Sequence, residues 1–177
     1  MTRHSPFGYI LRDSIRVLDN MLTAYHLHYK SGNWSHFFGT PSSHEDEKEA
    51  NQRTVEILNL VGLGDRKNMV AKYLPYGHQS ALGIALAVAT DPELLLLDEP
   101  VTGMNEEEIP IITDLIKRIR EMGVTIVVVE HNMKVIMGLC ERIVVLNFGE
   151  KIAEGSPSEI ISSREVIEAY LGVEEAE

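Results

Sequence analysis

The sequence predicts an α/β fold in which a parallel sheet flanked by helices is joined to a helical lobe. Short runs of Val, Ile and Leu without polar alternation occur at residues 94–97 and 124–129, and such runs are typical of strands buried in a parallel sheet. Helical patterns separate these runs, as they do in βαβ units. The first half of the chain shows helical periodicity instead, which predicts the lobe.

Two helices are expected in that first half. In the first, at residues 14–29, apolar side chains recur at mostly helical spacing: Ile15, Leu18, Met21, Leu22, Tyr25 and Leu27. Residues 31–46 carry scattered Gly, Pro and Ser, a composition that indicates a loop or insertion. A second helix is predicted at residues 47–60, with Gly62 or the Gly64-Asp65 pair ending it.

The second half is expected to alternate strands with helices: a strand at 94–97, a helix at 109–122, a strand at 124–129, a helix at 133–139 and a strand at 143–146. This order predicts a parallel sheet covered on both faces. The tail would then add a short strand at 151–153, a turn at Gly155 and two short helices that end at Leu171.

The helix at 109–122 carries its own start and stop signals. Asn105 and Glu108 have the spacing of a capping box, and Gly123 would close the helix. Pro110 inside the helix would remove a backbone hydrogen bond. A start near Ile109, or a local kink, would accommodate it.

Composition and charge exclude several classes of protein. The 177 residues fit one domain with a sizeable core, and the net charge of −11, without a dense cluster among the 16 Lys and Arg residues, argues against a nucleic-acid partner. No apolar run reaches the roughly 18–20 residues of a spanning helix. The N-terminus has no signal-peptide pattern, and the single Cys140, expected to be a small core residue, excludes an intrachain disulfide. A cytoplasmic location is therefore predicted.

Two adjacent carboxylates follow the strand at 94–97. Asp98 and Glu99 precede Pro100, at the edge of the sheet where parallel strands place their ligands. In nucleotide hydrolysis the first carboxylate can hold Mg²⁺ and the second can orient and deprotonate the attacking water. The alternative is an acidic turn that only ends a buried strand.

Two further features point to the same chemistry. The strand at 124–129 ends in Glu130-His131, so His131 would lie beside the same edge and could hydrogen-bond a phosphate, or be only a satisfied polar residue. Upstream, Tyr76, Gly77, His78 and Gln79 open an apolar helix. Backbone N–H groups and the positive end of the helix dipole suit an anion there, although a glycine before a helix is often only a turn.

The order of these features resembles one known family. The helix with its preceding turn, the Asp98-Glu99 strand, the Gly103-Met104-Asn105 turn and the Glu130-His131 strand resemble the signature motif, Walker B strand, D-loop and switch histidine of ABC ATPases. The variants at Tyr76-Gly77 and at 103–105, together with residues 166–172, look like the ATP-binding subunits of branched-chain amino-acid importers.

The resemblance implies a P-loop NTPase-like ABC ATPase core with a helical subdomain, here as a single partial domain: the subdomain and signature at about 14–80, the α/β core at about 81–155 and a helical tail at about 156–177. It also implies ATP and Mg²⁺ as cofactors. In this family two ATP-binding subunits, identical or different, pair head to tail with ATP between them. They drive integral-membrane permease subunits from the cytoplasmic face of the membrane.

Roles carry over by position. Asp98 would serve Mg²⁺, Glu99 would be the general base and His131 the switch residue. Gly77, with its neighbours Tyr76, His78 and Gln79, would face the nucleotide of the partner subunit, and Asn105 would lie at the seam between the subunits.

The sequence departs from the family at three places. It contains no G-x-x-x-x-G-K-[ST] phosphate loop. Phe7 lies where the family's Q-loop glutamine is expected, with no glutamine nearby, and Pro75 replaces the signature serine. The isolated chain, either a fragment of a complete subunit or a truncated copy that acts with an intact partner, is therefore expected to bind ATP weakly and to be inactive. A non-catalytic module for dimerisation or permease docking is the alternative. An ABC-type ATPase acting on DNA or ribosomes is disfavoured by the acidic charge.

Overall fold

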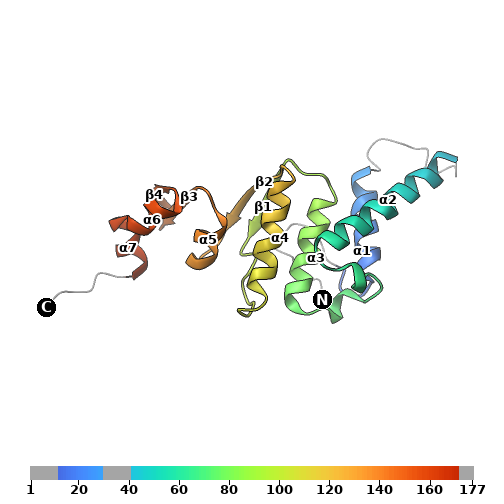
Figure 1. Ribbon diagram of the computed structural model, residues 1–177, viewed down its shortest axis with the longest axis horizontal. Helices are drawn as coiled ribbons and strands as arrows, with labels where there is room; N and C mark the ends of the chain where they lie inside the picture. The colour runs from blue at the N-terminus through green and yellow to red at the C-terminus, as the bar shows by residue number, and fades with distance from the viewer. Residues whose placement is uncertain (1–11, 30–40, 172–177) are drawn as a thin grey trace. The chain divides into compact units, whose positions relative to one another are not determined.

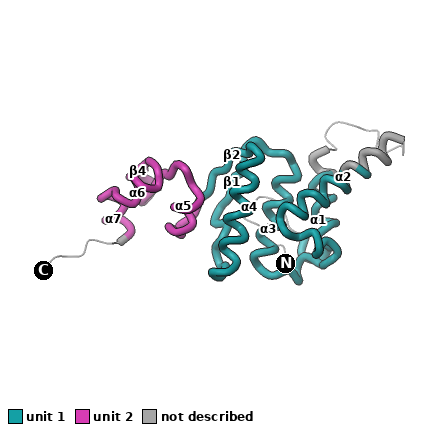
Figure 2. Tube along the Cα trace, viewed as in Figure 1, with its two compact units in different colours: residues 1–129 teal, residues 130–177 magenta. Residues whose placement is uncertain are grey.

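The computed structural model describes residues 12–29 and 41–171, and the chain divides into two compact units at residues 129 and 130 (Figures 1 and 2). The first unit contains α1 (Val17–Tyr29), α2 (Pro41–Leu60), the 3₁₀ helices η2 (Gly64–Arg66) and η3 (Ala71–Tyr73), α3 (Tyr76–Val88), β1 (Leu94–Asp98), α4 (Ile109–Glu121) and β2 (Thr125–Val129). The second contains α5 (Met133–Leu139), β3 (Ile143–Asn147), β4 (Glu150–Gly155), α6 (Pro157–Ser162) and α7 (Arg164–Leu171).

The predicted helical lobe is present, and α1 packs against both α2 and α3. The face that α1 buries differs from the predicted one, because Val17 and Ala24 enter the core while Leu18 and Leu22 are only half-buried. Asn20 is also buried: its side chain accepts a hydrogen bond from Arg12 N at 2.9 Å and donates to two backbone carbonyls. A polar residue therefore occupies a core position that apolar periodicity could not identify.

The second helix begins earlier than predicted, at Pro41, so residues 41–46 are helical and the loop prediction was wrong there. Glu and Lys are frequent at residues 45–49, and these side chains lose little rotamer freedom in a helix. The rest of the predicted loop lies outside the described residues. The predicted end at Gly62 is confirmed: its φ is 73°, and Leu63 N donates to Leu58 O at 2.7 Å, as in a Schellman motif.

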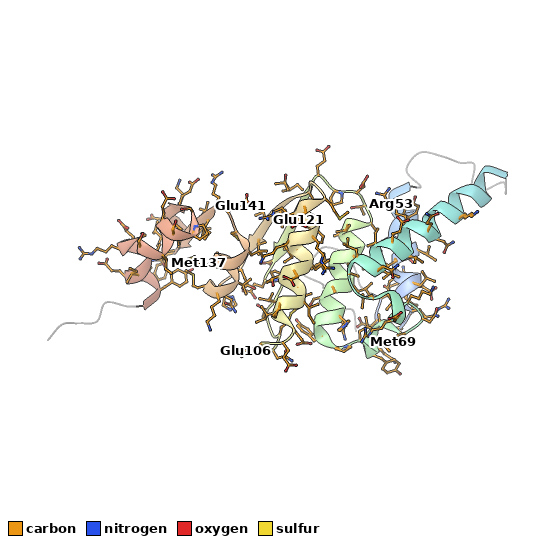
Figure 3. The ribbon with its side chains drawn as sticks, in the orientation of Figure 1. Arg53, Met69, Glu106, Glu121, Met137 and Glu141 are labelled. Atoms are coloured by element: carbon orange, nitrogen blue, oxygen red, sulfur yellow. The ribbon has the colours of Figure 1, made fainter. Side chains whose placement is uncertain are left out.

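At the centre of the first unit, α3 packs against α1, α2 and α4 and buries every residue from Ala81 to Val88. α4 begins at Ile109, which places Pro110 in the first turn, where a backbone N–H would have no helical partner. The helix buries Ile112, Leu115, Ile116 and Ile119, the face that its periodicity predicts. Figure 3 shows Glu106 and Glu121 at its two ends.

β1 and β2 are parallel, as predicted, with Leu96 opposite Val127 and Asp98 opposite Val129. Of the two faces predicted to be covered, one is covered among the described residues and the other is exposed. Leu95 and Leu97 are buried, whereas the side chains on the other face are exposed: Leu94 (52%), Leu96 (63%), Val127 (47%) and Val129 (60%). The buried runs of the sequence therefore form a sheet with one apolar face open in the described structure.

β3 was predicted to continue the parallel sheet, but its hydrogen-bonded neighbour among the described residues is the antiparallel β4. Phe148 and Gly149 make the two-residue turn between them, with φ values of 47° and 83°. Two residues suffice to join antiparallel strands, whereas parallel strands need a long crossover. Phe148 is fully exposed at the tip of this hairpin.

The second unit has its own small core of Ile143, Val145, Ile160 and Val166. The two short C-terminal helices are present as predicted, and both contact β4. Cys140 is half-buried beside this core, and burial raises the pKa of its thiol. In the described part of the chain, no helix is both long and apolar enough to cross a membrane.

Candidate functional site

The carboxyl end of β1 carries the predicted pair of carboxylates. Asp98 is the last residue of the strand, and Glu99 follows with its backbone N–H donating to Val129 O of β2 at 2.8 Å. Both side chains are exposed, and Thr102 Oγ1 donates to Glu99 Oε2 at 3.1 Å. The hydroxyl of Thr102 therefore orients the carboxylate of Glu99 at the edge of the sheet.

Glu99 has a φ of 47°, in the left-handed region that non-glycine residues rarely adopt. It also precedes Pro100, a position that favours extended backbone. Such strain costs about 1–3 kcal/mol and clusters at functional sites. A strained backbone at the residue predicted to be the general base supports a functional role for this turn.

Asp98 suits the metal role predicted for it, because Mg²⁺ commonly takes one or two carboxylates and completes its shell with water and phosphate oxygens. An exposed carboxylate at a strand end can bind in this way. Among the described residues no group of three or more His, Cys, Asp or Glu side chains is placed to hold a metal ion.

The amino end of α3 carries the second set of predicted residues. The helix begins at Tyr76, so Gly77 lies in its first turn rather than before it, and it is buried. Pro75 precedes the helix and makes no side-chain cap. Gln79 turns back to donate from Nε2 to Leu74 O at 2.9 Å, while Tyr76 is exposed, with its ring beside Gly103.

The N–H group of Gly77 already has an anionic partner. It donates to Glu108 Oε1 at 3.2 Å, and Glu108 Oε2 accepts a hydrogen bond from Asn105 N at 3.3 Å. The side chain of Asn105 in turn accepts from Glu108 N at 2.9 Å, which confirms the predicted capping box. Glu108 therefore joins the start of α3 to the turn that holds Asn105.

Glu108 was predicted as a capping residue only. Its contact with Gly77 spans 31 residues of sequence, and no local spacing indicates it. Glu108 also affects His78, which is half-buried. Burial and the nearby Arg66 lower the pKa of His78, and the charge of Glu108 opposes that shift.

His131 belongs to the second unit. Its side chain is 69% exposed, and Glu130 Oε2 accepts hydrogen bonds from the backbone N–H groups of His131 (2.8 Å) and Asn132 (3.3 Å). Asn132 caps α5 by accepting a hydrogen bond from Val135 N. Side chains on both sides thus fix the backbone around His131. Its position beside Asp98 and Glu99 stays a prediction.

The sequence matches two family models. One, described as ABC transporter, matches residues 4–102, more than half of the chain. The other, described as branched-chain amino acid ATP-binding cassette transporter, matches residues 150–176.

Curated relatives agree with these matches. The high-affinity branched-chain amino acid transport ATP-binding protein LivG of Salmonella typhimurium is 40% identical over 157 residues, which are 88% of this chain and 62% of LivG. BraF of Pseudomonas aeruginosa, described by the same function, is 38% identical with the same coverage. The chain thus spans 62% of the length of these relatives.

Solved structures show the same fold. The ADP conformation of the ATP-binding cassette MJ1267 matches with a TM-score of 0.73 at 22% identity, over 90% of this chain and 64% of that one. The dimeric, post-hydrolysis state of the cassette MJ0796, bound to ADP and Pi, matches with a TM-score of 0.66 at 26% identity, over 87% and 61%. The motifs, the fold and the family model agree, and the chain belongs to the ABC transporter family.

Proposed function

We propose that the chain is part of the ATP-binding subunit of an ABC importer for branched-chain amino acids. The observation that carries this proposal is the 40% identity to LivG over 88% of the chain. The match of residues 150–176 to the branched-chain family model supports the same substrate class. In this role the chain lies in the cytoplasm, on the inner face of the membrane, and pairs with a second ATP-binding subunit and with permease subunits.

Each site residue has a proposed role. Bound Mg²⁺ would neutralise charge on the phosphates, with Asp98 holding it. Glu99, held by Thr102 and placed by a strained backbone, takes the proton of the attacking water. His131, exposed on a fixed backbone, hydrogen-bonds the transferred phosphate. Tyr76, Gly77, His78, Gln79 and Asn105 face the nucleotide of the partner subunit.

The residues of this chain supply only part of a nucleotide site. Its 177 residues contain no G-x-x-x-x-G-K-[ST] loop to surround the phosphates with N–H groups and a lysine. At the start of α3, Gly77 N–H is taken by Glu108. The 177-residue chain alone is therefore expected to be inactive, and turnover belongs to the assembly.

A transport assay tests the proposal. ATP-binding subunits that carry these residues are reconstituted with the cognate permease in vesicles. Uptake of radiolabelled leucine is then measured in two separate conditions, with MgATP inside the vesicles and with MgATP outside them. The Glu99→Gln variant is expected to lower ATP-dependent uptake by about 10²–10⁴-fold, the range that general-base catalysis contributes. The exposed Glu107 provides a matched control, since Glu107→Gln should transport normally. Equal uptake by Glu99→Gln and wild type would refute the assigned role.

A second candidate is a non-catalytic module that dimerises or docks on the permease. Pro75 favours it, because proline at the start of α3 offers neither a hydroxyl nor an N–H to a phosphate. In that case Asp98 and Glu99 are relics, and uptake depends on the presence of the chain but not on Glu99. The same assay separates the two candidates.

A further inference from the structure

Gly77 is placed where a helix offers unpaired N–H groups. The first four N–H groups of an α-helix have no partner within the helix, and the dipole makes this end attractive to anions. In the described structure the N–H of Gly77 is not open to a ligand, because Oε1 of Glu108 accepts it at 3.2 Å. The carboxylate of the chain itself therefore accepts the N–H that an anion at this end of the helix would need.

The surroundings of Glu108 hold it in that position. Its second oxygen accepts the N–H of Asn105 at 3.3 Å, and its backbone N–H is bound by the side chain of Asn105 at 2.9 Å. The fit at Gly77 is close: a β-carbon there would lie 3.2 Å from Oε1 and 3.3 Å from Cβ of Glu108. Glycine at residue 77 therefore allows both the helix and the carboxylate to approach.

We propose that Glu108 is an internal competitor for nucleotide phosphate, whose carboxylate must leave Gly77 before a phosphate can bind at the start of α3. One N–H cannot serve two anions, and two negative charges a few Å apart repel each other. The phosphate belongs to a nucleotide held by a second cassette, so this step rests on the proposed function. The need to displace Glu108 from Gly77 therefore lowers the affinity with which this chain pairs with the second cassette.

Release of Glu108 would also affect the turn that follows Glu99. The carboxylate holds Asn105 N, and Asn105 follows Glu99 and Thr102 in one short segment. Phosphate binding at Gly77 would thus free the turn at 103–105 and, through it, the segment that carries the general base. Glu108 acts through other residues, so it is a positioning residue and not a catalytic one.

The contact itself is tested first, on the 177-residue chain. Hydrogen exchange of the Gly77 amide is measured by NMR in wild type, Glu108→Ala and Glu106→Gln. Loss of the hydrogen bond should speed exchange at Gly77 by about tenfold in Glu108→Ala. Glu106 is exposed at the same end of α4 (Figure 3), and its variant should exchange like wild type. Unchanged exchange in Glu108→Ala would overturn the proposal.

Competition is tested next, with inorganic phosphate as the probe. The Gly77 amide signal should shift saturably with phosphate in Glu108→Gln, which keeps the size of the side chain without its charge, and about tenfold more weakly in wild type. A sodium chloride titration at matched ionic strength controls for salt, and the Glu106→Gln variant controls for net charge. Equal response in wild type and Glu108→Gln, or none in either, would refute competition. Both outcomes are read without any transport activity.

Pairing with a complete, ATP-loaded cassette gives the final test. Glu108→Gln should pair about tenfold more tightly than wild type and Glu106→Gln. Weaker pairing by Glu108→Gln would show that the carboxylate supports the interface and would overturn the proposal. If no variant pairs, the proposed function fails and the phosphate titration alone decides whether Glu108 competes.

Discussion

Glu99 combines the carboxylate proposed as the general base with an unfavourable backbone conformation. Its φ of 47° costs about 1–2 kcal/mol for any residue with a β-carbon. Glu99→Gly and Glu99→Ala both lose the bond from Thr102, but only glycine tolerates the backbone. The free energy of unfolding, measured by urea denaturation, should therefore be about 1 kcal/mol higher for the glycine variant than for the alanine variant. Equal stabilities of the two variants would show that the backbone conformation of residue 99 carries no such cost.

His78 makes folding stability depend on pH. Burial, helped by Arg66, lowers its pKa below the ordinary value of 6.5, so the folded state favours the neutral ring. The stability linked to His78 is complete above pH 6.5 and is lost as pH falls through the lower folded-state pKa, because the unfolded chain binds the proton first. Urea unfolding of wild type and His78→Gln between pH 5 and pH 7.5 should show a smaller loss of stability in the variant. Parallel pH profiles would contradict the prediction.

At the scale of elements, the open face of β1 and β2 should tolerate polar substitution. Leu96 is 63% exposed, whereas its neighbour Leu97 is 1% exposed. Leu96→Lys is expected to change the free energy of unfolding by less than about 0.5 kcal/mol and to reduce aggregation seen by light scattering, because exposed apolar strands associate. Leu97→Ala, the buried comparison, should cost about 2–5 kcal/mol. A large loss in Leu96→Lys would mean that this face is covered in solution.

The elements themselves follow from local signals. A few neighbouring residues specify where α4 starts, at Ile109, and which of its faces is apolar. The end of α2 at Gly62 is specified in the same way. The start of α2 was missed because a polar, charged segment has no apolar periodicity to indicate a helix. The pairing of β3 with β4 was also missed, since strand partners depend on contacts that no single run of residues encodes.

At the scale of the whole molecule, the expected weakness of ATP binding can be measured directly. Several charge-assisted hydrogen bonds of the family's phosphate loop, about 1.5–3 kcal/mol each, have no counterpart in these 177 residues. Millimolar MgATP should therefore leave the melting temperature of the chain unchanged, and calorimetry should detect no micromolar binding. Micromolar binding that depends on Glu99 would show that a nucleotide site forms without such a loop.

The sequence by itself determined the family, the order of the elements and the residues at the end of β1, because motif spacing and hydrophobic periodicity are local properties of the chain. It also determined the Asn105–Glu108 capping box, which spans three residues. Only the tertiary structure decided that the same Glu108 reaches Gly77 and that Glu99 adopts a left-handed backbone. These features depend on how distant segments approach one another in space, and residue spacing along the chain does not specify that approach.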